Sequence, residues 1–280
     1  MNYKTVLVAL DDGPRCAARV ALGARLAAAS GGHLVGLAAT GLPDVIVAMN
    51  SAVPDAAESI QLSAGFLRER ADKVARDFER QAAAAGAPSF EARVVEAEPI
   101  DATVALGRCV DLVVVGQTDA KTLVDGVARD FPQQVVLHTG TPVLVVPFAG
   151  QFETIGRRVL IAWKDTREAA RAMRDALPFL RGAAKATLLA IGDARADAAP
   201  DDDTLRDVLA WLVAHGVAAE ARTVPRSGEV GDALLSMASD LSCDLVVMGA
   251  YGHSRLREWT LGGATRQMLA QMTVPVLMSH

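Results

Sequence analysis

The feature that most constrains the fold of this chain is an internal repeat. Three strand-like segments occur in the same order in both halves of the 280 residues. The paired segments are Val6–Asp12 with Val159–Asp165, Asp111–Gly116 with Asp244–Gly249, and Thr141–Leu144 with Val274–Leu277. A recurring set of segments predicts a duplicated structural unit. The length agrees with two domains, since one domain usually takes ~100–200 residues.

The repeat also predicts where the domains begin and end. We place one domain at residues 1–150 and the other at 156–280, with a short linker within Phe148–Arg157. So short a linker favours two halves that pack on each other as an internal pseudo-dimer. The first half has about 20 extra residues between its first two repeated segments. They fall within Leu42–Ser63, whose prolines and lack of a period predict a surface excursion or a short helix.

Each half is predicted to be a doubly wound α/β domain with a five-stranded parallel sheet. Short Val/Leu/Ile runs alternate with longer Ala-, Arg- and Glu-rich stretches, which is typical of a parallel sheet covered by helices on both faces. The predicted strands cover residues 4–10, 33–39, 90–95, 111–116 and 142–146, then 157–163, 186–191, 218–223, 244–248 and 275–279. The predicted helices cover residues 14–30, 64–85, 100–108 and 121–138, then 166–181, 201–215, 229–241 and 262–271.

Composition argues against several classes of partner. A net charge of −5 and an aromatic content of 4% disfavour nucleic acids and anionic membranes, which basic and aromatic surfaces recruit. No apolar run approaches the ~20 residues of a membrane helix. The run Val6–Leu10 is too short for an export signal, so we expect a cytoplasmic protein. Cys16, Cys109 and Cys243 form no C-x-x-C pair, so no metal site is expected.

The segment with the most chemical information runs from Asp244 to Thr265. A buried strand ends at Gly249, a loop containing Gly252 follows, and Gly262-Gly263 opens a helix. Glycine lets a phosphate approach backbone N–H groups, and a helix N-terminus offers unpaired donors and a favourable dipole. Open α/β sheets also hold ligands at the carboxyl ends of their strands. The sequence therefore predicts a phosphate cradle in the second half.

The spacing of these glycines, between Asp244–Gly249 and Val274–Leu277, resembles that of the universal stress protein family. The resemblance spans both halves. It implies a sheet order of 3-2-1-4-5 and, in the nucleotide-binding branch of the family, an ATP site built from strand one, strand two and the glycine motif. Matched onto this sequence, the residues that the resemblance implies are Met248, Gly249, Gly252, Gly262, Gly263, Ala264 and, beside the base, Ile191.

Further candidates come from their positions next to this motif. Trp163 lies beside the expected adenine position, and His253 and Ser254 follow Gly252 in the loop. The alternative for Trp163 is a packing role, as for most tryptophans. The alternative for His253 and Ser254 is a structural role in the loop.

Two positions depart from the family pattern. Gly263 stands where the family has Ser or Thr, and Thr265 is the residue that offers a hydroxyl instead. Lys164 stands where the family has an aspartate after strand one, and a lysine cannot accept a hydrogen bond from a ribose hydroxyl. Two alternatives stay open: Lys164 binds phosphate, or Asp165 replaces the missing aspartate.

The first half shows the opposite pattern. Asp11 matches the aspartate after strand one, but no second glycine follows Gly116 and no glycine pair opens the next helix. The carboxylates of Asp119, Asp125 and Asp130 would repel phosphate. We predict no phosphate site in this half. Its last strand, Val143–Val146, is expected to pair with Val276–Ser279.

These features predict a stress-response protein that binds an adenine nucleotide such as ATP, with Mg²⁺, through its second domain. Binding rather than catalysis is expected, because no Walker A motif is present. The alternatives are a slow nucleotide hydrolase and a protein-interaction module in which both pockets are degenerate. Unknown protein partners, and a homodimer of two chains, stay open alternatives.

Overall fold

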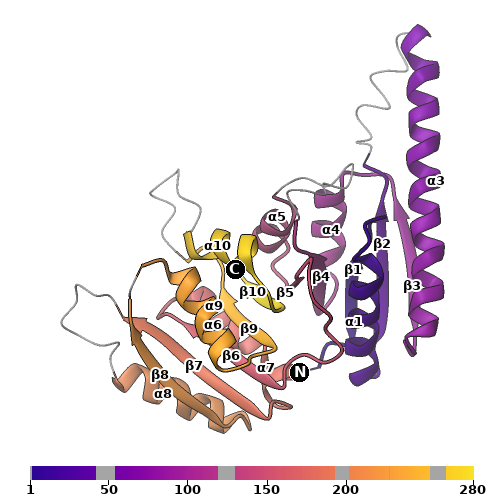
Figure 1. The fold of residues 1–280 in the computed structure, drawn as a ribbon. Coiled ribbons are helices and arrows are strands. Elements are labelled where there is room, and N and C mark those ends of the chain that lie inside the picture. The colour runs from indigo at the N-terminus through magenta and orange to yellow at the C-terminus, as the bar shows by residue number, and fades with distance from the viewer. Residues whose placement is uncertain (1, 42–53, 119–129, 193–201, 227, 253–262) are drawn as a thin grey trace. The chain divides into compact units, whose positions relative to one another are not determined.

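The computed structural model describes residues 2–41, 54–118, 130–192, 202–226, 228–252 and 263–280. The chain forms two compact units, Asn2–Thr141 and Pro142–His280. In each unit, helices flank a mainly parallel set of strands, as the repeat predicts, and the strands of the chain are assigned to one ten-stranded sheet (Figure 1). Of the helices that the structure describes, none is both long enough and apolar enough to cross a membrane.

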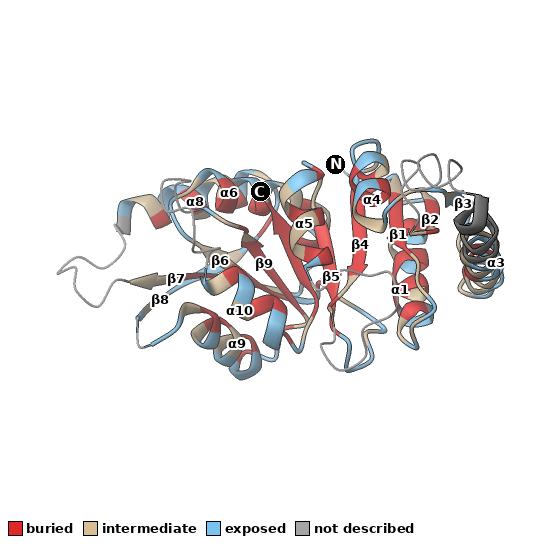
Figure 2. Cartoon of the chain, turned by 90° about the horizontal axis from the view of Figure 1, so that it is seen from above, coloured by how far each residue is buried: buried red, intermediate tan, exposed pale blue. Residues whose placement is uncertain are grey.

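The first unit is built around four parallel strands in the order β3-β2-β1-β4. Figure 2 shows α1 and α4 on opposite faces of this sheet. The elements are β1 (Thr5–Ala9), α1 (Cys16–Ala29), β2 (His33–Ala39), α3 (Pro54–Ala84), β3 (Phe90–Val95), α4 (Pro99–Gly107), β4 (Leu112–Gly116) and α5 (Phe131–His138).

The second unit repeats this arrangement, with its own five strands in the order β8-β7-β6-β9-β10. This is the predicted order 3-2-1-4-5. A sixth strand, β5 (Val143–Val146), pairs with β10, as predicted, and the structure shows that the two strands run antiparallel. The other elements are β6 (Arg158–Trp163), α6 (Arg167–Asp175), α7 (Leu177–Leu180), β7 (Lys185–Gly192), α8 (Asp202–Ala214), β8 (Ala219–Pro225), α9 (Val230–Asp240), β9 (Leu245–Gly249), α10 (Gly263–Gln271) and β10 (Val276–Ser279).

The central strands form where the sequence has short runs of Val, Leu and Ile. These β-branched and aliphatic side chains are almost fully buried in β1, β4, β6 and β9, as expected for strands covered on both faces. An aspartate precedes β4 and another precedes β9. The Asp111 carboxylate accepts hydrogen bonds from the backbone N–H groups of Lys4 and Thr5, at 2.7 and 2.8 Å. Asp244 accepts three such bonds at the start of β6, from residues 156–158.

The helices differ from the prediction in two places. Helix α3 begins at Pro54 rather than near residue 64, so part of the extra segment of the first half is helical, while residues 42–53 lie outside the described residues. The helix predicted over 166–181 is two helices, α6 and α7, that meet at Ala176. Pro178 lies in the first turn of α7, where its missing N–H costs least, so a new helix starts there. The described part of the helix predicted over 121–138 is α5.

A close approach between β2 and α3 fixes the packing of the first unit. The ring of Phe78 is 1% exposed and lies directly over Gly36. A Cβ added at Gly36 would lie 2.7 Å from three ring carbons of Phe78, closer than carbon atoms can pack. Glycine is therefore required here so that the helix can lie close to the sheet.

We expect Gly36→Ala to lower the free energy of unfolding of the first unit by ~1–3 kcal/mol, the usual cost of overpacking a core. The matched control is Gly65→Ala in α3, where an added Cβ meets no atom within 4 Å. That change should raise the free energy of unfolding by ~0.5–1 kcal/mol, because alanine loses less backbone entropy in a helix. Urea denaturation of both variants measures this. Equal effects of the two changes would contradict the packing argument.

Candidate functional site

A cavity of about 590 Å³ opens at the carboxyl ends of β6, β7 and β9 in the second unit. The N-terminal turns of α9 and α10 supply further lining residues. Open α/β sheets hold ligands at this edge, beside the point where the strand order reverses. The residues predicted for a nucleotide site that line the cavity are Trp163, Lys164, Asp165, Ile191, Met248, Gly249, Gly252, Gly263, Ala264 and Thr265. The remaining three, His253, Ser254 and Gly262, lie outside the described residues.

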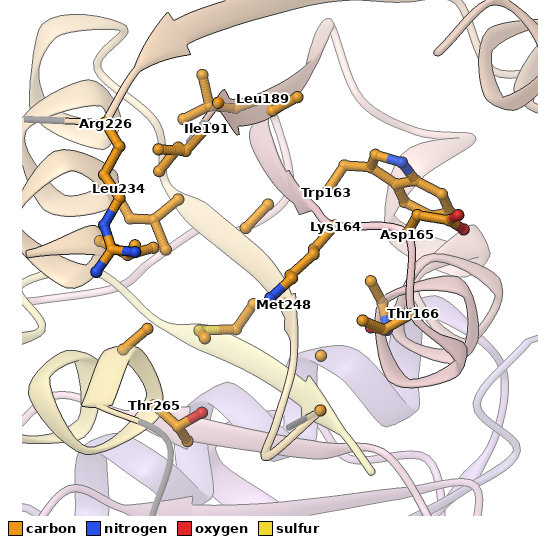
Figure 3. A pocket seen from close by; sticks show the side chains of 18 of the residues that line it. Trp163, Lys164, Asp165, Thr166, Leu189, Ile191, Arg226, Leu234, Met248 and Thr265 are labelled. Atoms are coloured by element: carbon orange, nitrogen blue, oxygen red, sulfur yellow. The ribbon is translucent and has the colours of Figure 1, made fainter. Parts of the chain in front are cut away.

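One wall of the cavity is apolar. Leu189 and Ile191 project from β7 and Leu234 projects from α9, and Figure 3 shows the three side chains around one end of the pocket. A planar, weakly polar ring system fits against such a wall, because burying apolar surface is favourable by ~25 cal/mol per Å². Thr265, on α10, lies at the other end (Figure 3).

The Lys164 side chain extends into the middle of the pocket. Lys164 directly follows β6, and its ammonium group lies near Met248, between the apolar wall and Thr265 (Figure 3). The side chains of Trp163 and Asp165 lie together on the other side of Lys164 from Ile191. Trp163 is thus not part of the apolar wall that would receive the base.

The three glycines of the motif that the structure describes have different structural roles. A Cβ at Gly249 would lie 2.5 Å from the backbone nitrogen of Ala169, and one at Gly252 would lie 2.9 Å from Oε2 of Glu168. Both glycines therefore let the start of α6 approach the end of β9. Gly263 is different, because the nearest atom to an added Cβ is Oε2 of Glu229, at 4.0 Å. This position, at the N-terminus of α10, faces open space.

The Thr265 hydroxyl has a structural contact. Thr265 is buried, and its Oγ1 accepts a long hydrogen bond of 3.4 Å from the backbone N–H of Tyr251. Tyr251 has a φ of 59°, a left-handed conformation that costs energy for a residue with a side chain. The hydroxyl predicted to replace the one missing at Gly263 thus helps to hold the loop start.

Sequence reasoning missed two charged residues of the pocket. Arg226 and Glu229 follow β8 and line the cavity. The predicted strand order could have pointed to them. In a parallel sheet the segment after β8 begins at the carboxyl ends of the strands, as do the segments after β6 and β9. From the sequence, Glu229 is only the first residue of a predicted helix, and Arg226 has no predicted role.

Glu168 is a buried carboxylate beside the pocket. Its side chain is 6% exposed and accepts a hydrogen bond from Nε of Arg167 at 2.5 Å. Burial by itself raises the pKa of Glu168, but the Arg167 hydrogen bond and charge, a backbone hydrogen bond and the nearby His280 outweigh it and lower the pKa below the usual value. The folded state therefore favours the charged form of Glu168.

In the first unit an arginine fills the corresponding place. Arg19, on α1, is 4% exposed and forms an ion pair with Asp11, the aspartate after the first strand. Its Nη2 also donates to the carbonyl oxygen of Ala9 at 3.3 Å. A Cβ at Gly116 would lie 2.7 Å from Nη1 of Arg19. The carboxylate that matches the family pattern is thus already bound by the protein itself. Asp130 precedes α5, while Asp119 and Asp125 lie outside the described residues.

We expect Asp11→Leu to destabilise the first unit by ~3–5 kcal/mol, because it leaves the buried Arg19 guanidinium without its counter-ion. The double variant Asp11→Leu/Arg19→Met should cost less than Asp11→Leu alone. A control is Asp12→Ala, which breaks the more exposed Asp12–Arg70 pair and should cost at most ~1 kcal/mol. Urea denaturation measures all three. If the double variant is the least stable, the ion pair is not the reason.

A second prediction concerns pH. Because the folded state lowers the pKa of Glu168, this group stabilises the fold above its unfolded pKa, and the contribution is lost as pH falls through the folded pKa. Glu168→Gln should therefore lower the melting temperature most at neutral pH, and the difference from wild type should shrink in acid. Melting curves from pH 7 down to about pH 3 test this. A difference that grows in acid would contradict the assigned direction.

Comparisons with known proteins point to one family. The universal stress protein family model matches the chain twice, over residues 2–147 and 156–280. A universal stress protein of Synechocystis sp. is 40% identical over 50 residues, which are 18% of this chain and 17% of that protein. The match thus spans less than a fifth of this curated relative.

Two solved structures resemble the whole chain. A universal stress protein from Archaeoglobus fulgidus has 16% identity and a TM-score of 0.73, over 100% of this chain and 99% of that one. A functionally unknown protein from Pseudomonas aeruginosa has 12% identity and a TM-score of 0.59, over 99% and 92% of the two chains. At these identities the likeness shows the fold.

Proposed function

Because this chain belongs to the universal stress protein family, we propose that its second unit binds an adenine nucleotide in the pocket between β6, β7 and β9. The observation that carries the proposal is the layout of this pocket. An apolar wall that fits a base lies at one end, and the N-terminus of α10, with open space at Gly263, lies at the other. A base and a phosphate chain require these two environments.

The phosphates of the ligand are assigned to α10. Backbone N–H groups in the first turn of a helix have no partner within the helix, and they favour an anion. Gly263 and Ala264 stand in this turn and line the pocket without a bulky side chain. ATP, ADP and AMP are therefore the ligands to test, with Mg²⁺ carried by the phosphates.

The first unit serves as a scaffold in this proposal. Arg19 occupies the place beside Asp11 and Gly116, so a ligand would have to displace a buried ion pair. The second unit then has binding of the nucleotide, rather than its turnover, as its role.

One observation favours slow hydrolysis as a second candidate. Glu229 lines the pocket, and its Oε2 is the nearest atom to the open side of Gly263, where the phosphates would lie. A carboxylate at that place is suited to orient a water molecule. Glu229→Gln separates the two functions. It should abolish any release of phosphate in a single-turnover assay with ATP and Mg²⁺, and binding should stay or become tighter.

The main test is thermal melting with millimolar ATP, ADP or AMP, in a matched pair of variants at Gly263. A ligand at ~100 times its Kd adds ~2.7 kcal/mol to the stability of the unit that binds it. Gly263→Asp places a carboxylate in the open space, so the melting shift should disappear. Without ligand this variant should lose little stability, because an acid in the first turn of a helix is favourable and opposes the repulsion from Glu229. Gly263→Ser supplies a hydroxyl to the phosphate and should bind about tenfold tighter.

Gly263 is a better position for this test than Gly252. A Cβ at Gly252 would lie 2.9 Å from Oε2 of Glu168 and force that carboxylate to shift, so loss of binding there would have a second cause. If neither wild type nor Gly263→Ser shows a shift with any nucleotide, the proposed function is wrong. The protein-interaction alternative then becomes the one to pursue.

A further inference from the structure

We propose that this pocket selects a nucleotide whose ribose carries a second phosphate, on its 2′ or 3′ hydroxyl, and that Lys164 determines this selectivity. The inference rests on the proposed function and names the class of ligand. It depends on where Lys164 lies between the two ends of the pocket.

The layout of the pocket places the sugar beside Lys164. The wall of Leu189, Ile191 and Leu234 is at one end, and α10 with Thr265 is at the other (Figure 3). In a nucleotide the ribose joins the base to the 5′-phosphate. A base on the apolar wall and a 5′-phosphate on α10 therefore leave the ribose in the middle, where the ammonium group of Lys164 lies.

The chemistry of lysine indicates what that ribose carries. An ammonium group is a donor without any acceptor, whereas a free ribose hydroxyl is best held by a carboxylate, which accepts its hydrogen bond. In dinucleotide-binding α/β folds, an acidic residue holds the ribose 2′-hydroxyl, and a basic residue nearby accommodates a 2′-phosphate. Lysine also binds phosphate as a compact point charge. In the middle of this pocket the residue is the basic Lys164, which fits a ribose phosphate better than a free ribose hydroxyl.

The neighbouring charges leave this role to Lys164. The Asp165 side chain points to the opposite side, next to Trp163 (Figure 3). Glu229 is near Gly263, at the phosphate end. Arg226 is at the rim beside Ile191 and Leu234. Of the charged side chains labelled in Figure 3, Lys164 is the one whose head group lies between the two ends of the pocket.

The test compares isomers. ADP and the adenosine 2′,5′- and 3′,5′-bisphosphates contain the same atoms and two phosphates each, so they differ in where the second phosphate is attached. Titration calorimetry on the full chain without Mg²⁺ gives the three dissociation constants. We expect one of the bisphosphates to bind at least about tenfold tighter than ADP, a difference of ~1.4 kcal/mol. The preference should fall as salt is raised, because it is electrostatic.

Two variants assign the preference to Lys164. Lys164→Asp should lose it or reverse it, since a carboxylate repels a ribose phosphate and accepts hydrogen bonds from free ribose hydroxyls. Lys185→Ala is the matched control. Lys185 starts β7 at the other edge of the sheet, pairs with Glu220 and does not line this pocket, so its removal should leave the preference unchanged.

The outcomes separate the two proposals. If wild type binds ADP as tightly as both bisphosphates, or if Lys164→Asp keeps the preference, the inference is overturned and nucleotide binding stands. If neither ADP nor a bisphosphate binds while the Gly263 variants are also silent, the proposed function fails, and this inference fails with it.

Discussion

Each unit depends on a carboxylate that holds the start of its central strand. Asp111 binds the first backbone amides of β1, and Asp244 binds those of β6. These hydrogen bonds join neighbouring parallel strands at their amino ends and so fix the register of β1 against β4 and of β6 against β9. The same register decides which residues meet at the carboxyl ends. In the second unit, the position of the residues around the cavity therefore depends on Asp244, at the opposite end of the strands.

From this shared frame the two units have diverged in opposite directions. In the first, the acid after the central strand is kept and neutralised by Arg19 from the following helix. In the second, the acid is replaced by Lys164, and small residues in α6 and α10 leave the cavity open. In the first unit the two charges, those of Asp11 and Arg19, pair with each other inside the fold. In the other, Lys164 lines the cavity.

Much of this arrangement was predictable from the sequence. Apolar runs indicate strands, and the spacing of glycines indicates where the backbone is closely approached. The apolar runs of the repeat predict the strands and the pairing of β5 with β10, and the family resemblance implies the strand order. Burial of Arg19 was not predictable, since arginines are almost never fully buried unless paired, and its partner is eight residues away in the sequence. The place of Arg226 and Glu229 in the pocket could be found only from the fold, because a pocket also includes residues from segments that show no sequence motif. The break before Pro178 should have been predicted, since proline marks the start of a helix.

The pairing of β5 with β10 has a consequence for how the chain is divided. β5 closes the first family match in the sequence but hydrogen-bonds along the last strand of the second unit. It covers an edge that would otherwise present unpaired N–H and C=O groups to other chains. The second family match by itself, residues 156–280, therefore leaves out a strand that pairs with its own last strand. A self-contained second unit begins at Pro142, before the linker that the sequence repeat suggests.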